Sequence, residues 1–576
     1  MDGNSFSPEQ QNYLKGFMAG VEARRGTLSP GGAPEGGAPP DAMRAAQDAA
    51  VARGGKLTAE EKMKREKHPL DRWDEVTARA AADRFPHGLE NLATRWHGLF
   101  YVGPTQDAFM CRLRIPGGFV TAHQFRGIAA IAEECGGGWT DCTTRNNLQI
   151  RLIPAAKGPE VIERLGDLGI LPKGTGADNI RNITANPTAG IDPNELVDVR
   201  PIVRALHVHI LHSRDLFGLP RKFNISLDGG GRIAVLEDTN DVGFSACTVA
   251  GESAPVFRLA LGGITGHRDF ARDTGVVVEP GMVVRVCDAI LRVFLASGDR
   301  TNRGKARLKY VLDDWGLPKF LDAVEAQLGT PLRRVEAERI LMPPPVEKHG
   351  HVGVHDQRQD GLQYIGLVLP VGRISAERMR GLAEVADRYG SGTLRLTAWQ
   401  NLLISDIPRD RMPDAQAAIA ALGLHWEASH VRGGLVACTG SAGCKFAAAD
   451  TKAHAASLAA YLDERITVTR PVNIHLTGCH NSCAQHYIGD IGLIGAKVER
   501  GEDEEIEGYD LHVGGGAGVE QGIGRLVRPK LGHDALNPTV LNLLRAWMEE
   551  APDTSFQAFA AARSEDALRA IAEGGA

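Results

Sequence analysis

The chain has 576 residues, of which 43% are hydrophobic and 24% are charged, and its formal net charge is −6. This size and balance are typical of a globular protein with several domains and a sizeable core. The negative net charge does not favour a nucleic-acid-binding protein. No apolar run is long enough to cross a bilayer, and the N-terminus lacks a basic segment followed by an apolar one. We therefore expect a cytoplasmic protein without nucleic-acid or membrane partners.

The first part of the chain differs in composition from the rest. Apolar residues at helical spacing predict a short amphipathic helix over residues 1–23. Residues 26–56 are rich in Gly, Pro and Ala, and we expect their first half to be a flexible linker. Residues 57–95 are charged and helical in pattern, and are expected to wrap the surface. The N-terminal helix and linker region is assigned to residues 1–67.

Six segments of the chain occur twice in the same order. The pairs are 114–138 with 368–392, 143–154 with 397–408, 184–190 with 437–443, 223–230 with 472–479, 241–246 with 490–495, and 259–263 with 511–515. The nearly constant offset between the members of each pair indicates two copies of one α/β module in a pseudo-two-fold arrangement. A large cofactor is expected at a site between such halves.

Four of the nine cysteines form two close pairs. Cys438 and Cys444 lie in CTGSAGC, Cys479 and Cys483 lie in CHNSC, and 34 residues separate the pairs. Four thiolates in two short loops fit a cubic iron–sulfur cluster. Structural zinc also takes four thiolates, but usually from C-x2-4-C knuckles that are tighter than the first pair. Four unrelated buried cysteines are the third interpretation. The surrounding small residues favour the cluster, because backbone N–H groups can turn toward the sulfurs.

The cysteine pairs have no counterpart in the first copy. Ala185 aligns with Cys438, and Gly230 aligns with Cys479. The cluster therefore belongs to the second copy, and the first copy is free for another role. The remaining cysteines are scattered and are expected to be small buried side chains; they are Cys111, Cys135, Cys142, Cys247 and Cys287.

The first copy is rich in basic residues within apolar, strand-like segments. They are Arg112, Arg114, Arg145, Arg181, Arg221 and Lys222, followed by Arg300, Arg303, Lys305, Arg307 and Lys309. A single such residue is usually a solvated surface charge. Several buried cations, however, need anionic partners, and the planar fork of arginine suits carboxylates. The pattern therefore predicts a polyanionic ligand.

With these motifs the chain resembles the ferredoxin-dependent assimilatory nitrite and sulfite reductases, most closely the ferredoxin–nitrite reductases, which hold a sirohaem coupled to a [4Fe–4S] cluster. The resemblance covers about residues 68–560, and C-x5-C…C-x3-C with an asparagine inside the second pair is its most specific motif. It implies an α+β protein built from α/β modules, with an internally duplicated nitrite/sulfite reductase fold. Two ferredoxin-like half-domains (68–165 and 348–415) would pair with each other, beside two sirohaem and iron–sulfur modules (171–340 and 425–560), the second of which carries the cluster.

The resemblance also implies roles for individual residues. The cluster ligands would be Cys438, Cys444, Cys479 and Cys483, and Cys483 would also bridge to the sirohaem iron. The substrate side would carry Arg112, Arg181 and Lys222, with Asn224 as a specificity position. Contacts to the macrocycle would come from Thr143, Arg145, Gln149, Arg221 and Asn481. Sirohaem carries eight carboxylates, which would explain a cationic pocket in an acidic protein.

The choice of substrate depends on one position. Sulfite reductases typically have PRKFK where this chain has PRKFN, and the loss of a cation at Asn224 favours nitrite, the less charged anion. We therefore predict six-electron reduction of nitrite to ammonia, with reduction of sulfite to sulfide as the alternative. A non-catalytic iron–sulfur electron-transfer protein and a cobalamin-pathway oxygenase are alternatives of other kinds.

The electron donor is expected to be a separate protein. No Gly-x-Gly-x-x-Gly element follows a strand and opens a helix, so the sequence does not predict a dinucleotide-binding domain. The resemblance implies reduced ferredoxin, which would meet the enzyme through a transient electrostatic contact. A monomer is expected.

Overall fold

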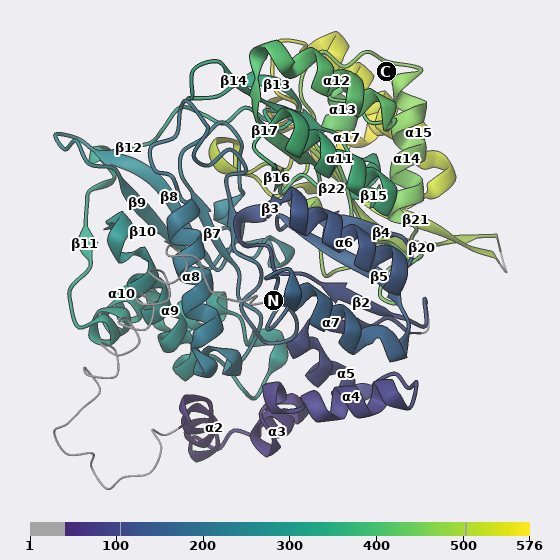
Figure 1. Ribbon diagram of the computed structural model, residues 1–576. Helices are drawn as coiled ribbons and strands as arrows, with labels where there is room; N and C mark the ends of the chain where they lie inside the picture. Colours follow the sequence, from purple (N-terminus) through teal and green to yellow (C-terminus); the bar gives the residue numbers. More distant parts are fainter. Residues whose placement is uncertain (1–40, 104, 502–503, 576) are drawn as a thin grey trace, which may run out of the picture.

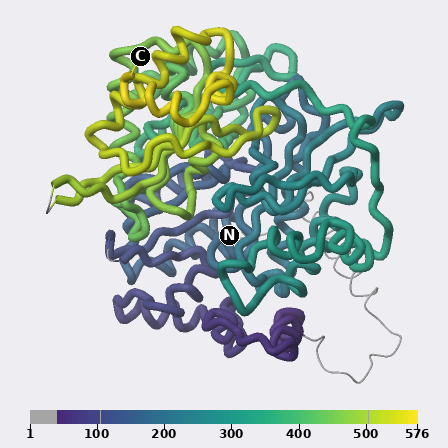
Figure 2. Tube along the Cα trace, turned by 180° about the vertical axis from the view of Figure 1, so that it is seen from behind, coloured from purple at the N-terminus to yellow at the C-terminus, as the bar shows by residue number. Residues whose placement is uncertain are grey.

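The part of the chain described here, in a computed structural model, forms four β-sheets and the helices that cover them (Figure 1). The structure describes residues 41–103, 105–501 and 504–575. The helix predicted over residues 1–23 lies outside these residues. No helix in the described part of the chain is long and apolar enough to cross a membrane. Seen from behind, the N-terminal helices and the C-terminal part lie at opposite ends of the molecule (Figure 2).

The N-terminal helices line one edge of the molecule (Figure 1). The first, α2 (Ala42–Ala52), is capped by Asp41, whose carboxylate accepts a hydrogen bond from Met43 N at 3.0 Å. It occupies the second half of the Gly, Pro and Ala-rich stretch, because its alanines favour a helix once the prolines end. The next are α3 (Ala59–Glu66), α4 (Trp73–Ala81) and α5 (Gly88–Thr94), so the helical pattern over residues 57–95 is confirmed.

Two five-stranded sheets exchange one strand each. The first runs β1-β2-β5-β4-β15, and the second runs β13-β14-β17-β16-β3. The first copy contributes β3 (Phe119–Thr121), which pairs with β16, and the second contributes β15 (Arg373–Ser375), which pairs with β4. The predicted pairing of the half-domains is thus confirmed. The other strands are β1 (Leu99–Tyr101), β2 (Phe109–Arg112), β4 (Trp139–Thr143), β5 (Asn147–Ile153), β13 (Gly353–Asp356), β14 (Leu362–Leu367), β16 (Thr393–Leu396) and β17 (Leu402–Pro408).

A single hydrophobic core joins these two sheets. The helix α6 (Ala122–Cys135) follows β3, and α11 (Ala376–Tyr389) follows β15; the two helices pack against each other. Phe125 and Ile128 of α6 belong to the same buried cluster as Met379 and Leu382 of α11. The outer helices are α7 (Gly158–Asp167) and α12 (Met412–Ala421). Because the core and the exchanged strands are shared, the halves form one unit.

The other two sheets, of seven and five strands, repeat one topology. In each, the first three strands are parallel and the next pairings are antiparallel: β6-β7-β8 continue to β9 and β10, and β18-β19-β20 continue to β21 and β22. The first sheet holds β6 (Thr184–Ala185), β7 (Ile225–Asp228), β8 (Val242–Val249), β9 (Val256–Leu261), β10 (Arg272–Val278), β11 (Arg333–Arg334) and β12 (Ile340–Leu341); the second holds β18 (Leu435–Ala437), β19 (Ile474–Thr477), β20 (Ile491–Arg500), β21 (Glu504–Val513) and β22 (Arg525–Gly532). The internal duplication is therefore confirmed.

The helices of these modules correspond only in part, since the described residues form three in the first module and five in the second. The first module carries α8 (Arg200–His212), α9 (Val283–Ser297) and α10 (Leu308–Leu328), and the second carries α13 (His430–Gly433), α14 (Thr451–Asp463), α15 (His533–Glu550), α16 (Phe556–Ala561) and α17 (Glu565–Ala572).

Rare backbone conformations also recur at equivalent positions of the two copies: Asn146 and Gln400 have φ of 47° and 59°, and Leu236 and Gln485 have φ of 58° and 55°. Since non-glycine residues seldom adopt positive φ, this recurrence indicates a common ancestral backbone.

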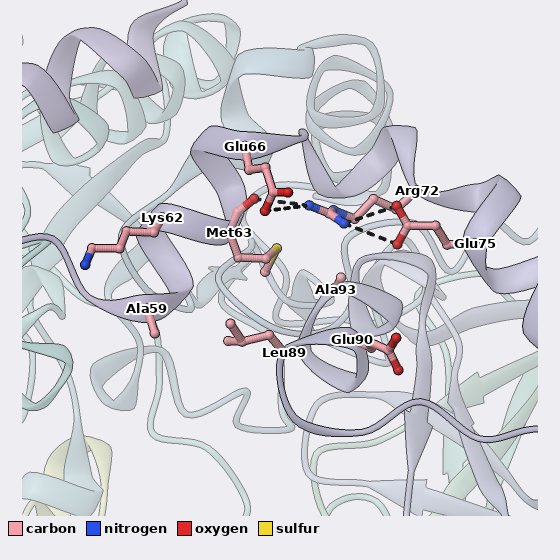
Figure 3. Close-up of a pocket in the computed structure, with 9 residues that line it drawn as sticks. All are labelled: Ala59, Lys62, Met63, Glu66, Arg72, Glu75, Leu89, Glu90 and Ala93. Atoms are coloured by element: carbon pink, nitrogen blue, oxygen red, sulfur yellow. Dashed lines mark hydrogen bonds and ion pairs between the residues drawn. The ribbon is translucent and has the colours of Figure 1, made fainter.

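An open pocket of about 360 Å³ lies among α3, α4 and α5 (Figure 3). Arg72 lies between Glu66 and Glu75, with contacts of 3.8 Å and 3.1 Å. Lys62 lines the pocket on α3. None of the predicted site residues is among those that line it.

Shortening a buried side chain of the exchanged strand β3 should lower the stability of both half-domains. Val120 of β3 is 2% exposed and pairs with Leu394 of β16. We expect Val120→Ala to lower the free energy of unfolding by about 2 kcal/mol, because it leaves a cavity in the shared core. Amide exchange should rise in β16 as well as in β3. Val519→Ala, at an 81% exposed position, should change stability by less than about 0.5 kcal/mol; faster exchange confined to β3 would contradict the shared unit.

Candidate functional site

The two cysteine loops meet at one edge of the sheet formed by β18 to β22. Cys438 directly follows β18, and Cys479 follows β19, its parallel neighbour. The carboxyl ends of parallel neighbours lie at the same edge, so the loops are brought together. Gly478 N donates a hydrogen bond to Cys438 Sγ at 3.1 Å, and Asn481 Nδ2 donates to Cys479 Sγ at 3.5 Å. Such N–H···S contacts stabilise thiolate ligands.

The four thiols of these loops influence one another. Burial raises the pKa of the Cys479 thiol, and Cys444 and Cys438 add to this rise. Burial likewise raises the pKa of Cys483 to about 12, with contributions from Cys438 and Cys479. The structure therefore brings all four predicted ligands into one neighbourhood. In the part of the chain that the structure describes, no three His, Cys, Asp or Glu side chains are placed to hold a single metal ion.

Cys483 lies in a recess. Its side chain is exposed to water, yet the surrounding protein raises its pKa by desolvation. Both observations hold for a sulfur that water can touch but protein largely encloses. Thr144 Oγ1, from the first half-domain, donates to the Cys483 carbonyl at 3.1 Å. The cysteine loop of the second copy is thus held directly by the first.

Predicted cations of the first copy lie in the same neighbourhood. Arg112 and Lys222 both act to lower the pKa of Cys483. Burial lowers the pKa of Arg181, and the positive charge of Arg112 lowers it further. Arg112 Nη1 donates to Thr175 O at 3.3 Å, and Arg181 Nη2 donates to Ala177 O at 2.8 Å. These guanidinium groups are anchored by carbonyls, which leave their positive charge uncompensated.

Lys222 is a strongly perturbed cation of the site. Burial lowers its pKa to about 7, and Arg307 and Arg181 add to the effect. Arg307 binds Asp241 through two hydrogen bonds of 3.1 and 2.7 Å. Lys222 is therefore close to half-charged at neutral pH, a state suited to proton transfer.

Asn224 lies two residues beyond Lys222 on the same segment. Between them, Phe223 is fully buried and pairs with Ile180, whereas Lys222 and Asn224 are partly exposed. Alternating burial places these two side chains on one side of an extended segment. Asn224 N donates to Asp241 Oδ2 at 2.8 Å, which fixes its backbone.

Three of the residues predicted to contact the macrocycle, Thr143, Arg145 and Asn481, differ in their surroundings. Arg145 donates to the carbonyls of Asn182 at 2.9 Å and Ile225 at 3.2 Å and to Asn240 Oδ1 at 2.8 Å, so it connects three segments of the first copy. Thr143 Oγ1 accepts from Arg145 N at 3.3 Å, next to Thr144. Asn481 is exposed beside Cys479.

Arg151 is a site residue that the sequence analysis missed. It forms an ion pair of 3.0 Å with Asp141 and donates to Thr439 Oγ1 at 2.6 Å and to Gly443 O at 3.3 Å, inside the first cysteine loop. It also donates to Gln149 Oε1 at 2.9 Å. The available signal was strand alternation, because Gln149 and Arg151 share one face of β5, and Gln149 is paired with Arg112 of β2.

The donor set fits an iron–sulfur cluster beside a polyanionic macrocycle. Two of the thiols already accept N–H groups, as cluster sulfurs do. Within residues 41–103, 105–501 and 504–575, Arg112, Arg181 and Lys222 have no carboxylate within ion-pair distance, although burial lowers the pKa of each. Carboxylates of a bound ligand would supply the missing counter-charge.

The corresponding loops of the first copy are filled by their own side chains. Asn186 Nδ2 donates to Asp228 Oδ1 at 2.9 Å, and Gly230 N donates to the same oxygen at 2.7 Å. Asp192 Oδ2 accepts from Arg232 N at 2.7 Å and from Thr188 Oγ1 at 2.8 Å. Carboxylates thus bind the loop backbone where the second copy presents thiols.

Comparison with known proteins identifies the family. The model described as "Nitrite and sulphite reductase 4Fe-4S domain" matches residues 176–332 and 429–558, and that described as "Nitrite/Sulfite reductase ferredoxin-like half domain" matches 101–168 and 355–422. The chain belongs to the nitrite and sulphite reductase family. It is an oxidoreductase with a [4Fe–4S] domain.

Relatives match this family member over most of its length. The ferredoxin–nitrite reductase of Synechococcus elongatus is 36% identical over 82% of this chain and 93% of its own, and that of Leptolyngbya laminosa is 37% identical over 84% and 96%. The solved structure titled "Structure of Mycobacterium tuberculosis NirA protein" has a TM-score of 0.82 and is 30% identical, covering 90% of this chain and 99% of that one. The duplicated fold of the family therefore extends over most of this chain.

The charge of Lys222 should change near neutral pH. Because its pKa is lowered to about 7, Lys222 loses its charge as the pH rises through 7. Arg307→Met removes a positive neighbour and should move this midpoint upward by about one pH unit or more. The midpoint can be measured from the rate of Lys222 acetylation, followed by peptide mass spectrometry. Arg164→Met, which removes an arginine paired with Glu134 at 2.8 Å, is the control; equal midpoints in both variants would contradict the assignment.

Proposed function

We propose that this protein reduces nitrite to ammonia in a six-electron reaction, with electrons from reduced ferredoxin and with a sirohaem and a [4Fe–4S] cluster as cofactors. The observation that carries the proposal is the position of Cys483, whose thiol lies in electrostatic range of Cys438 and Cys479 and also of Lys222 and Arg112. A thiolate so placed can belong to the cluster and still face a cationic anion site. The names of the cyanobacterial relatives, ferredoxin–nitrite reductase, support the substrate and the donor.

The cysteines would hold the cluster, and Cys483 would also reach the sirohaem iron. The proposed ligands are Cys438, Cys444, Cys479 and Cys483. When bound, the two cofactors supply the electrons and the metal atom at which the anion is reduced. Gly478 and Asn481 donate to ligand sulfurs and would stabilise their negative charge. The proposed macrocycle contacts are Thr143, Arg145, Gln149, Arg221 and Asn481.

The cations of the first copy would bind and protonate the substrate. Burial lowers the pKa of Arg112 to about 10. Arg112 therefore stays charged at neutral pH and can hold an anion. Arg181 adds a second anchored guanidinium group, and both would stabilise charge on the departing oxygen. Lys222, with a pKa of about 7, can give up a proton from Nζ and regain one. Asn224, on the same side as Lys222, leaves the site one cation short of the sulfite reductase pattern.

Ferredoxin would dock transiently. Electron-transfer partners meet through small, charged interfaces, and ferredoxins are acidic, so a local basic surface is proposed for the contact. We also propose, from the sequence alone, that the enzyme is a monomer and acts in the cytoplasm.

Loss of one loop thiol should empty the cluster site. We expect purified Cys479→Ser to retain little iron or acid-labile sulfide, because one of four ligands is gone. Cys135→Ser, in a buried thiol of α6, should keep both at the wild-type ratio. Iron and sulfide analysis per polypeptide measures the outcome. Full iron and sulfide in Cys479→Ser would remove this thiol from the ligand set.

Asn224 should favour nitrite over sulfite. With reduced ferredoxin or methyl viologen, we expect kcat/KM for nitrite to exceed that for sulfite by at least about tenfold. Asn224→Lys adds a cation beside Lys222 and should lower this ratio by about threefold or more. Asn194→Lys makes the same change at an exposed position and should leave the ratio unchanged. A wild-type preference for sulfite would overturn the substrate assignment, and an unchanged ratio in Asn224→Lys would exclude this position from discrimination.

A further inference from the structure

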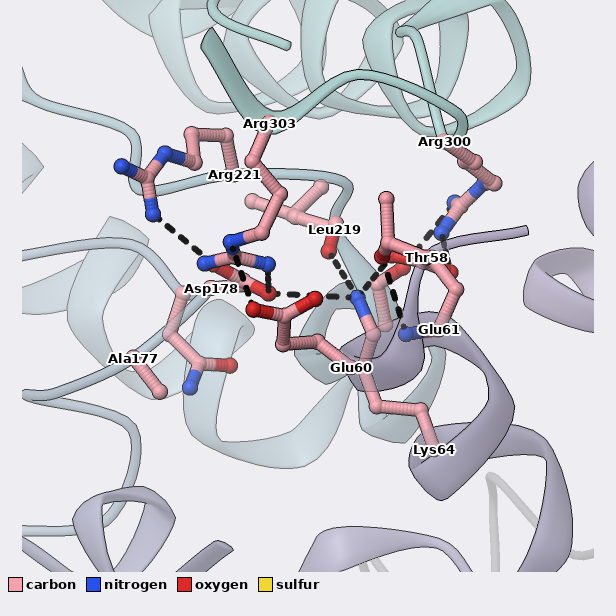
Figure 4. A network of polar contacts seen from close by, with 12 residues as sticks. Thr58, Glu60, Glu61, Lys64, Ala177, Asp178, Leu219, Arg221, Arg300 and Arg303 are labelled. Carbon is pink, nitrogen blue, oxygen red and sulfur yellow. Dashed lines mark hydrogen bonds and ion pairs between the residues drawn. The ribbon is translucent and has the colours of Figure 1, made fainter. Parts of the chain in front are cut away.

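A buried cluster of charges connects α3 to the wall of the proposed site (Figure 4). Lys64 donates to Asp178 Oδ2 at 3.3 Å and to Leu219 O at 3.1 Å, and it is also bound to Glu61 on its own helix. Arg303 binds both Asp178 oxygens at 2.8 Å. The side chains of Lys64 and Asp178 are fully buried. Buried charges of this kind are tolerated only when their geometry is fixed. The cluster therefore holds α3 in a fixed position against the segments that contain Asp178 and Leu219.

Asp178 lies inside the segment that anchors Arg181. The guanidinium group of Arg181 donates to the carbonyls on either side of Asp178, at 2.8 Å to Ala177 and 3.5 Å to Asn179. Its backbone N–H donates to Phe223 O at 2.8 Å, and Phe223 N donates to Asn179 O at 3.0 Å. The segments that carry Arg181 and Lys222 are therefore paired, and a shift of Asp178 would move both.

The cluster also has one cation more than it has carboxylates. Its cations are Lys64, Arg221, Arg300 and Arg303, and its carboxylates are Glu60, Glu61 and Asp178. Arg221 has the longest contact, 3.8 Å to Asp178, and the most exposed side chain of the four cations, at 37%. It is the cation least engaged by the cluster, and it can turn its charge toward an anionic ligand.

We propose that Lys64 is a positioning residue for the anion site. It holds Asp178 in place, which keeps Arg181 and Lys222 at fixed relative positions. It also leaves Arg221 free to bind an anionic ligand. The inference rests on the proposed function and deepens it. Lys64 comes from a helix outside both family-model matches, which begin at residues 101 and 176. Without the charge of Lys64 the cluster loses its surplus cation, and Asp178 would draw Arg221 inward, away from the ligand.

The chain offers a matched control. Lys62 lies on α3, two residues from Lys64, but it is exposed and lines the open pocket of Figure 3. Lys62→Met and Lys64→Met remove the same charge from the same helix. A compensating pair is also available, because Glu61→Gln combined with Lys64→Met removes one charge of each sign and restores the balance of the cluster.

The experiment compares the purified, cofactor-loaded full-length variants. We expect Lys64→Met to raise KM for nitrite by about tenfold with kcat changed by less than about threefold, because misplaced substrate-binding groups weaken anion binding. Lys62→Met should match the wild type. Adding Glu61→Gln to Lys64→Met should restore KM to within about threefold. A role of Lys64 in packing alone would not be rescued by this second change, so an unrescued KM would overturn the proposal.

A second readout does not depend on activity. Amide exchange in residues 177–181 should be faster in Lys64→Met than in Lys62→Met, and slow again in the compensated variant. Equal exchange in Lys64→Met and Lys62→Met would overturn the proposal even if nitrite is reduced. Conversely, a wild-type enzyme that leaves nitrite unchanged refutes the proposed function, while the exchange data still decide the role of Lys64. If Lys64→Met does not fold, Lys64→Gln, which keeps hydrogen-bond donors without the charge, takes its place in both measurements.

Discussion

The reciprocal exchange of β3 and β15 is the constraint on which the rest of the molecule depends. The proposed site needs cations from the first copy and thiols from the second, so the two copies must be fixed relative to each other within hydrogen-bonding distance. Exchanged edge strands and a shared core achieve this, since neither half-domain completes its sheet alone. The contact from Thr144 to the Cys483 loop, at 3.1 Å, is one local result of that alignment.

Charge is distributed unequally over this symmetric frame. Equivalent asparagines, Asn224 and Asn473, both donate from their backbone N–H to an aspartate at the equivalent place, Asp241 at 2.8 Å and Asp490 at 2.6 Å. The first aspartate binds Arg307 and the second binds Lys348. The framework has thus been kept in both copies, whereas the groups that face the ligand differ. Such divergence after duplication would let one copy specialise in binding metal and the other in binding anions.

The sequence reveals the duplicated order of elements because each repeated segment contains strand cores and turn glycines long enough to compare. The exchange of β3 and β15 is not visible in it, since three residues give no alternating pattern. Cysteine spacing is a strong signal, and the structure gathers those thiols. Arg151 could have been found from its alternation with Gln149 on β5. The role of Asp178 could not have been found from the sequence, because nothing about a single aspartate in a loop indicates that Lys64 and Arg303 will bury it.

The first copy closes its loops with hydrogen bonds of its own, such as those from Asn186 and Gly230 to Asp228. Its loops are therefore closed by groups of the chain itself. In the second copy, the corresponding loops present the thiols that are proposed as cluster ligands. The loops of the second copy would thus depend on iron more than those of the first, and a shortage of iron in a cell would affect the two copies of one molecule unequally.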